Sequence, residues 1–197
     1  MDDHPAVRTG LRGILTARRC VASVTAVANA RDAIAAARGQ ASDGRAFDVA
    51  VVDYHLPDRD GLSLTRQLKN LPNPPRVLIY SAFGDTRLAM AALVAGADGI
   101  CNKERGDLDL LDAVRAVASG IPVVPAIRPD VMIAAARLID GEDLSILGML
   151  INRVAPADVA SALGITRGWL EARRWAILQQ LTGDPRATPT FARAAAR

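Results

Sequence analysis

Five polar residues in this sequence stand where a fold could bring them to one site. Asp53 ends a buried-looking apolar run, and Ser81 and Lys103 stand at or just after the ends of the next two apolar runs along the chain. Asp2 and Asp3 come immediately before the first expected helix. Because the ligand sites of open α/β sheets lie beyond the carboxyl ends of the strands, we expect these five side chains to share one crevice.

The chemistry of this set is that of phosphoryl transfer. Crowded carboxylates repel one another unless a hard cation neutralises them, and oxygen ligands with room for water suit Mg²⁺. An aspartate beside such a metal can accept a phosphoryl group, which makes Asp53 the candidate acceptor. Lys103 would offset charge on the transferred oxygens, and the Ser81 hydroxyl would hydrogen-bond to one of them.

Each of these residues alone has an ordinary structural interpretation, because a strand-end aspartate usually caps a turn and a lone serine indicates nothing. The joint placement, with one polar group after each successive strand, is what predicts a site. Lys103 adds to the signal, since only two of the 24 basic residues are lysines. A compact ammonium therefore stands there in a chain that otherwise uses arginine.

Alternating apolar runs and helical patterns predict the elements that position these groups. The pattern indicates an α/β fold with a doubly wound parallel sheet, followed by a small all-α domain. The expected strands are 21–27, 47–53, 76–81 and 99–101. The expected helices are 5–18, 30–38 with Asn29 as N-cap, 62–71, 86–95 and 108–119, and 39–45 is expected as a loop.

After Ser119 the alternation ends. Prolines at 122, 125 and 129 indicate a linker with one helical stretch over 132–138. Three further helices are expected at 144–151, 156–163 and 166–181, the last with Thr166 as N-cap. The tail beyond Gly183 is rich in Ala, Pro, Thr and Arg, which predicts disorder.

Composition narrows the class of protein. A chain of 197 residues that is 50% hydrophobic can bury one or two cores. Every apolar run is interrupted well before the ~20 residues of a spanning helix, and the first residues do not form a leader, so we expect a cytoplasmic protein with no membrane partner. Cys20 and Cys101 lack the spacing of a disulfide framework or a zinc site, and both are expected as buried thiols.

Four stretches together resemble a response-regulator receiver domain over residues 2 to about 120. They are Asp2-Asp3-His4, the run from Val51 to Gly61, Ser81-Ala82, and Ala95-Gly96-Ala97-Asp98-Gly99 leading to Lys103. The resemblance implies that Asp53 is the phosphoacceptor and that Asp2 and Asp3 place Mg²⁺, with the His55 backbone carbonyl as a further ligand. It also makes Ser81 the switch hydroxyl and Lys103 the phosphate partner. The side chains of His4 and His55 are expected in solvated loops.

Two positions depart from the family pattern. The family has an apolar strand at the centre of the sheet immediately before the paired acids, whereas this sequence starts at Met1-Asp2. Our hypothesis is that a misassigned start or a truncation has removed that strand, which would expose the edges of its neighbours. The second departure is Ile100, which stands where the family usually has an aromatic residue that moves with the switch.

The C-terminal pattern over about 140–182 resembles the helix-turn-helix of LuxR or NarL/FixJ proteins. The resemblance implies that the helix starting at Thr166 enters the major groove of DNA. An excess of basic residues from Gly164 onward fits a nucleic-acid partner. Glu171 opposes phosphate binding, and Trp175 is expected in the core or at a dimer surface. The candidate DNA contacts are Thr166, Arg167, Trp169, Leu170, Arg173 and Arg174.

The sequence therefore predicts a NarL/FixJ-type two-component response regulator. Its expected parts are a receiver at 1–120, a linker at 121–139, a helix-turn-helix domain at 140–182 and a disordered tail at 183–197. A histidine kinase would phosphorylate Asp53, and the altered receiver surface would change homodimerisation and binding to double-stranded DNA. Enzyme activity would be limited to slow self-dephosphorylation.

Two alternatives belong to other classes. One is a signalling adaptor whose degenerate helix-turn-helix binds protein, which Glu171, Trp169 and Ile100 favour. A steep loss of DNA affinity with salt would separate it from a DNA-binding regulator. The other is an aspartate-based phosphatase, which the sequence disfavours because His55 stands where such enzymes have a second acid two residues after the first.

Overall fold

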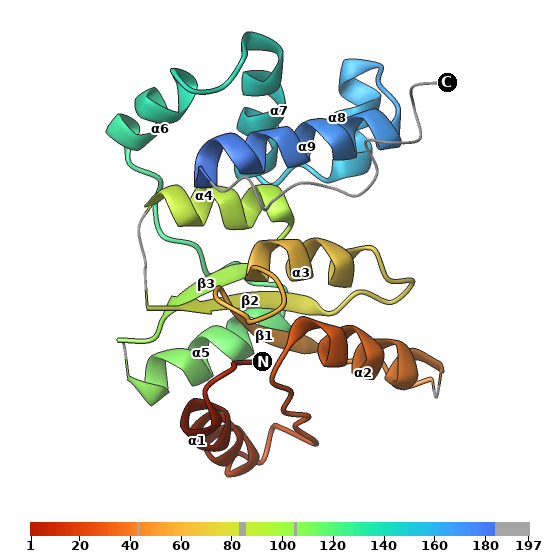
Figure 1. Ribbon diagram of the computed structural model, residues 1–197, viewed down its shortest axis with the longest axis vertical. Coiled ribbons are helices and arrows are strands. Elements are labelled where there is room, and N and C mark those ends of the chain that lie inside the picture. Colours follow the sequence, from red (N-terminus) through yellow and green to blue (C-terminus); the bar gives the residue numbers. More distant parts are fainter. Residues whose placement is uncertain (43, 83–85, 105, 184–197) are drawn as a thin grey trace. The chain divides into compact units, whose positions relative to one another are not determined.

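The computed structural model describes residues 1–42, 44–82, 86–104 and 106–183 (Figure 1). The chain divides into two compact units: unit 1 comprises 1–84 and 96–125, and unit 2 comprises 85–95 and 126–197. Of the predicted tail at 183–197, all but Gly183 lies outside the described residues. No helix of the described residues is long and apolar enough to cross a membrane.

A parallel sheet forms the centre of unit 1, as predicted. Its described strands are β1 (Val49–Asp53), β2 (Arg76–Ser81) and β3 (Gly99–Asn102), in the order β1-β2-β3. Val52, Val77 and Ile79 are fully buried. Burial on both faces explains why these strands read as continuous apolar runs instead of alternating ones.

Helices of unit 1 cover both faces of this sheet. Figure 1 shows α3 on one face and α5 on the other. The Asn29 side chain accepts from Asp32 N (2.8 Å), which confirms the expected cap of α2, and Asp58 accepts from the first two amides of the same helix. The helices are α1 (Pro5–Thr16), α2 (Ala30–Ser42), α3 (Gly61–Lys69) and α5 (Asp107–Ala118).

Three local predictions for unit 1 are wrong. Residues 21–27 run as an irregular segment and not as a strand, because none of the described strands pairs with them to satisfy their backbone groups. Helix α2 continues through the expected loop to Ser42, since Gly39 lowers helix stability by only about 1 kcal/mol. Cys20 is exposed beside the irregular segment, whereas Cys101 is buried as expected.

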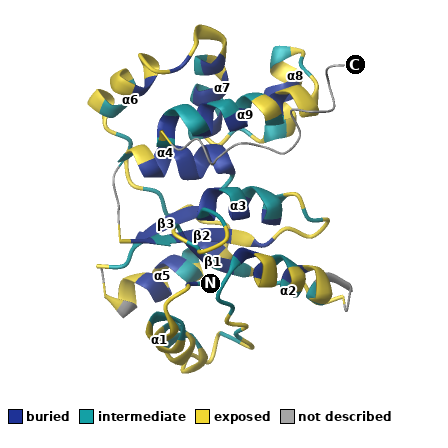
Figure 2. Cartoon of the chain, in the orientation of Figure 1, coloured by how far each residue is buried: buried dark blue, intermediate teal, exposed yellow. Residues whose placement is uncertain are grey.

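Unit 2 is helical and includes one helix that the sequence analysis places in the receiver. Helix α4 (Thr86–Ala95) packs against α9, α7 and α6. Every residue from Leu88 to Ala95 is buried (Figure 2), as expected for a helix without a polar face. The other helices are α6 (Pro129–Ala136), α7 (Gly141–Ile151), α8 (Pro156–Leu163) and α9 (Arg167–Thr182).

Asp98 fixes the start of β2 to the turn before β3. Its carboxylate accepts from Val77 N (2.7 Å), from Arg76 Nη1 (3.0 Å) and from Lys69 Nζ. Burial alone would raise the pKa of this carboxyl, but the hydrogen bonds from Lys69, Val77 and Arg76 outweigh it and lower the pKa. Asp98 therefore stabilises the fold as the anion.

Replacing Asp98 by Asn should lower the free energy of unfolding at about pH 7 by about 2 to 3 kcal/mol, because the buried charge network loses its anion. The folded pKa lies below the unfolded one, so this difference should shrink as the pH falls below about 4. Urea unfolding at several pH values measures it. Asp112→Asn, which removes an exposed partner of Arg115, is the control and should cost less than about 0.5 kcal/mol. Equal losses in both variants would contradict this account.

Candidate phosphoacceptor site

The ends of the three described strands meet at one edge of the sheet. Asp53 and Ser81 are the last residues of β1 and β2, and Lys103 follows β3 directly. The Lys103 amide donates to the Ser81 carbonyl (2.8 Å), which holds the two positions together. The structure therefore brings together the strand-end groups that the sequence predicts.

The Lys103 ammonium joins two acids that lie far apart in the sequence. It lies 2.7 Å from Asp2 Oδ2 and 2.7 Å from Asp53 Oδ2. Both carboxylates are buried, with relative exposures of 0% and 4%. Lys103 supplies the positive charge that offsets the burial of these two carboxylates.

Backbone pairing beside β1 holds Asp2 in the crevice. The Met1 ammonium donates to Val51 O (2.9 Å), and Asp53 N donates to Met1 O (3.0 Å). On its other side, Asp2 N donates to Val27 O (3.3 Å). Met1 is thus in ladder register with the end of β1, which places Asp2 next to Asp53.

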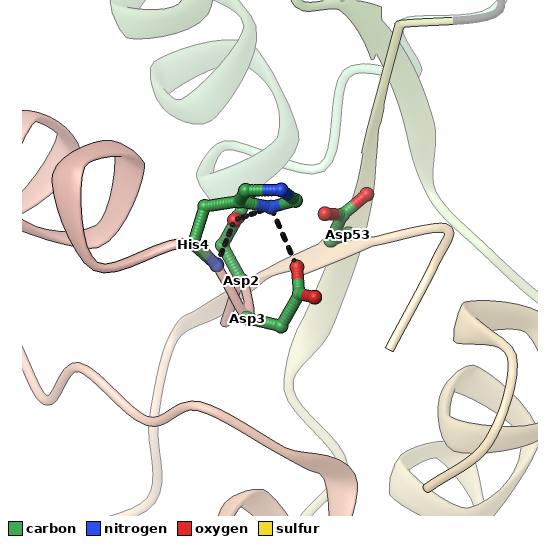
Figure 3. Close-up of side chains that lie close together, drawn as sticks. All are labelled: Asp2, Asp3, His4 and Asp53. Carbon is green, nitrogen blue, oxygen red and sulfur yellow. Dashed lines mark hydrogen bonds and ion pairs between the residues drawn. The ribbon is translucent and has the colours of Figure 1, made fainter. Parts of the chain in front are cut away.

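The N-terminal acids form one cluster with His4 (Figure 3). One possible ligand atom from each of Asp2, Asp3, His4 and Asp53 lies within 4.8 Å of all the others. His4 Nδ1 is 2.7 Å from Asp3 Oδ1 and 3.4 Å from Asp2 Oδ1. The His4 side chain is largely exposed, as expected, but it faces the acids. The sequence analysis did not place His4 in this cluster, although its position directly after the paired acids is a signal that could have done so.

The electrostatics of the cluster distinguish its members. Burial raises the pKa of Asp53, and the nearby Asp2 charge adds to this effect against the opposing hydrogen bond from Lys103. Burial also acts on Asp2, but hydrogen bonds from Lys103 and the His4 amide lower its pKa. The pKa of Lys103 is raised because its bonds to both carboxylates outweigh the cost of burial. Lys103 therefore remains charged.

A tight loop after β1 presents the amide of His55 to the candidate acceptor. His55 N donates to Asp53 Oδ1 (3.2 Å), and Gly61 N donates to Tyr54 O (2.7 Å) to close the loop. A Cβ at Gly61 would overlap the Asp53 carbonyl oxygen, so only glycine fits there. Asp60 then caps α3 by accepting from Ser63 N (2.8 Å).

Five of the six candidate DNA contacts divide into an exposed group and a buried one. Thr166 caps α9 as predicted, and Arg167 and Trp169 are exposed. Leu170 is buried, and the buried Arg174 donates through Nε (3.0 Å) and Nη2 (2.7 Å) to the Val94 carbonyl of α4. These two side chains cannot contact DNA in this arrangement of unit 2.

Arg173 is held by an acid of a neighbouring helix of unit 2. The guanidinium donates through Nε (2.6 Å) and Nη2 (2.7 Å) to the fully buried carboxylate of Asp143 in α7. This bidentate pair raises the pKa of Arg173. Trp175 lies in the core, as one of its two expected locations.

Comparison with known proteins decides the family. Residues 1–115 match the family described as the response regulator receiver domain. The chain belongs to the response-regulator receiver family. This confirms the predicted resemblance and the α/β fold class, and it makes the chain a two-component response regulator.

The relatives of this response regulator extend into the helical part. It is 28% identical over 184 residues to the transcriptional regulatory protein UhpA of Salmonella typhimurium, covering 92% of this chain and 89% of UhpA. It is 34% identical over 123 residues to the DNA-binding transcriptional activator DevR/DosR of Mycobacterium tuberculosis, covering 61% of this chain but only 53% of that protein.

A solved structure gives the same assignment. The LuxR-family two-component response regulator from Aurantimonas sp. SI85-9A1 is 30% identical, covers 69% of this response regulator and 93% of its own chain, and has a TM-score of 0.55. The predicted LuxR-type family is thereby confirmed.

Replacing Lys103 by Met should lower the free energy of unfolding by about 3 kcal/mol at about pH 7, because two buried carboxylates lose their shared cation. The pKa of each carboxyl would then rise above its unfolded value, so the penalty should decrease as the pH falls toward about 4. Chemical unfolding across this pH range measures the effect.

Glu104→Gln is the matched control for Lys103→Met, since it changes an exposed neighbouring charge outside the cluster. It should have nearly the same stability as the parent protein. A Lys103→Met penalty that does not change with pH would rule out the shared-cation interpretation.

Proposed function

We propose that a histidine kinase phosphorylates Asp53 in a Mg²⁺-dependent reaction and that the phosphorylated protein controls transcription by binding DNA through unit 2. The observation that carries the first part is the bridging Lys103 ammonium, 2.7 Å from the Asp53 carboxylate at the shared edge of the sheet. The matches to transcriptional regulators along most of the chain support the second part.

In the proposed reaction an Asp53 carboxylate oxygen attacks the phosphorus atom of a phosphohistidine. A phosphorus–oxygen bond forms as the phosphorus–nitrogen bond breaks, and the imidazole of the kinase leaves. Lys103 then balances part of the charge on the transferred oxygens, with Ser81 beside it at the end of β2. Only the ionised carboxylate is a nucleophile, so the raised pKa of Asp53 makes the reaction slower at acidic pH.

The donor set fits a hard divalent cation. Carboxylate oxygens of Asp2, Asp3 and Asp53 lie in one cluster, and we propose them as ligands of Mg²⁺ together with the His55 carbonyl. When bound, Mg²⁺ would neutralise charge on the phosphoryl oxygens. The His4 nitrogen in the same cluster is a softer ligand that suits transition metals better than Mg²⁺.

The proposed DNA surface is the exposed start of α9. Thr166, Arg167 and Trp169 lie there, whereas Leu170 and Arg174 would have to leave their contacts before they could reach DNA. We propose residues 140–182 as the DNA-binding domain, 1–120 as the receiver and 121–139 as the linker. We further propose that the active form is a homodimer with no enzyme activity beyond slow loss of its own phosphoryl group.

Incubation with acetyl phosphate should add one phosphoryl group per chain in the presence of Mg²⁺ and none after chelation. Intact-mass spectrometry measures the adduct. Asp53→Asn should abolish it, whereas the control Glu104→Gln, an exposed acid near the cluster, should retain it. Unchanged phosphoryl uptake by Asp53→Asn would overturn the acceptor assignment.

Binding to double-stranded DNA of mixed sequence should weaken steeply as salt is added, because phosphate contacts release counterions. Arg167→Ala should reduce the slope of log affinity against log salt by about 1. Fluorescence anisotropy at several salt concentrations measures it.

The control for Arg167→Ala is Arg128→Ala, which removes an equal charge from an exposed pair with Asp130 elsewhere in unit 2. Its slope should match that of the parent protein. DNA binding that does not depend on salt, or equal changes in both variants, would favour the adaptor over the DNA-binding regulator.

A further inference from the structure

An exposed aromatic ring at the start of α9 is held in place by its neighbours in unit 2. Trp169 is 40% exposed, and the other large exposed hydrophobic side chains of the described residues are aliphatic. Its amide donates to the Thr166 hydroxyl oxygen (3.2 Å), so the cap of α9 fixes its backbone. The Arg173 guanidinium lies over its ring, with 5.5 Å between the guanidinium carbon and the ring centroid. A large side chain fixed in this way loses little conformational entropy on binding.

The Arg173 guanidinium is itself anchored by acids at the start of α7. Asp143 accepts from both Nε and Nη2, and Asp140 Oδ2 lies 4.0 Å from Nη2. The Asp143 carboxylate is fully buried, so moving Arg173 away would remove the cation that compensates a buried charge. Arg173 therefore stays over the Trp169 ring.

This anchoring gives Arg173 a role other than that of a surface cation. Its charge is already balanced by a carboxylate inside unit 2, so it adds little to the attraction of DNA phosphates. A guanidinium over an indole ring is instead attracted to the ring by a cation–π interaction. Arg173 is thus suited to hold Trp169 in place and unsuited to bind a phosphate.

The chemistry of a DNA groove narrows what a fixed indole ring can contact. Trp169 is the third residue of α9, and the first residues of a recognition helix face base edges in the major groove. The apolar group on those edges is the methyl group of thymine. Because the Arg173 guanidinium covers one face of the ring, the ring cannot insert between two unpaired bases.

The charges near Trp169 also fit DNA. Arg167 is exposed at the first position of α9. Glu171 opposes phosphate binding, but it accepts a hydrogen bond from Arg174 Nη1, so a cation of the same helix offsets its charge. The start of α9 can therefore approach a duplex without a strong repulsion from this acid.

We propose that Trp169 recognises the methyl group of thymine in the major groove and that Arg173, anchored by Asp143, is the positioning residue that orients its ring. This inference rests on the proposed DNA binding by unit 2 and names the class of site: double-stranded DNA with a thymine facing the start of α9. Such a contact depends on the base sequence, whereas phosphate contacts depend on salt.

The probe is the duplex that the full chain, treated with acetyl phosphate and Mg²⁺, selects from a pool of random sequences of about 20 base pairs, long enough for two half-sites. Each thymine of that duplex is then replaced in turn by uracil, which lacks only the methyl group. We expect the affinity to fall about fourfold at a thymine that Trp169 contacts, because a buried methyl group contributes about that factor. Fluorescence anisotropy measures the affinities.

Three variants separate the contact from its support. Trp169→Ala should bind the thymine and uracil duplexes equally, whereas Leu138→Ala, which removes a similarly exposed apolar side chain elsewhere in unit 2, should keep the difference. Arg173→Lys keeps the charge that can pair with Asp143 but loses the planar group over the ring. It should therefore lose most of the thymine–uracil difference while the dependence of affinity on salt stays the same.

Tryptophan fluorescence provides a second readout, because Trp169 is exposed whereas Trp175 is buried. Iodide in solution should quench the emission of Trp169, and the selected duplex should protect it. Circular dichroism shows whether each variant is folded, so that a lost difference reports on the contact.

The proposal would be overturned if no thymine of the selected duplex lowered the affinity by at least about twofold on replacement. It would also be overturned if the difference persisted in folded Trp169→Ala or was unchanged in folded Arg173→Lys. Tighter binding to a single strand than to the duplex would indicate stacking on an unpaired base and would equally contradict it. If the chain retained no duplex from the pool, the proposed DNA binding would fail as well, so the two failures are distinguishable.

Discussion

The site depends on one ammonium shared by two buried carboxylates. Lys103 contacts Asp2 and Asp53 at 2.7 Å each, and its positive charge offsets the cost of burying these two carboxylates. The contact joins the start of the chain, the end of β1 and the residue after β3. Because residues so far apart in sequence meet at one cation, the crevice exists only when the sheet is assembled.

Beneath that contact, the sheet is fixed by a second, purely structural network. The Asp98 carboxylate accepts hydrogen bonds from Val77 N at the beginning of β2 and from Lys69 Nζ at the end of α3. This network sets the register of β2 against β3 and hence the relative positions of Ser81 and Lys103. Of the two described lysines, Lys103 thus belongs to the site, and Lys69 belongs to the network that holds the sheet in register.

The sequence was sufficient for most of the chemistry and for the elements that carry it. Asp53, Ser81 and Lys103 were predictable because strand ends in a parallel sheet share an edge, and the predicted limits of α4 and α8 agree with the structure. The expected strand at 21–27 did not form. Its apolar pattern is a local property of the sequence, whereas a strand forms only when another strand pairs with it. Pairing depends on residues elsewhere in the chain.

The same distinction between local pattern and tertiary contact explains why two of the DNA contacts predicted in α9 are held by other helices of unit 2. Arg173 and Arg174 read as surface cations, yet Asp143 pairs with one and the Val94 carbonyl accepts from the other. Nothing in the spacing of α9 shows that α7 and α4 cover this face. Arg167 and Trp169, near the start of the helix, remain exposed as the pattern predicts.

The central claim is that the Asp53 carboxylate accepts the phosphoryl group. Borohydride reduces an aspartyl phosphate to homoserine, so reduction of the phosphorylated protein followed by tandem mass spectrometry locates the acceptor directly. We predict homoserine at position 53 and at no other aspartate. Homoserine at Asp2 or Asp3, or no reduction product in a protein that carries the phosphoryl mass, would contradict the account.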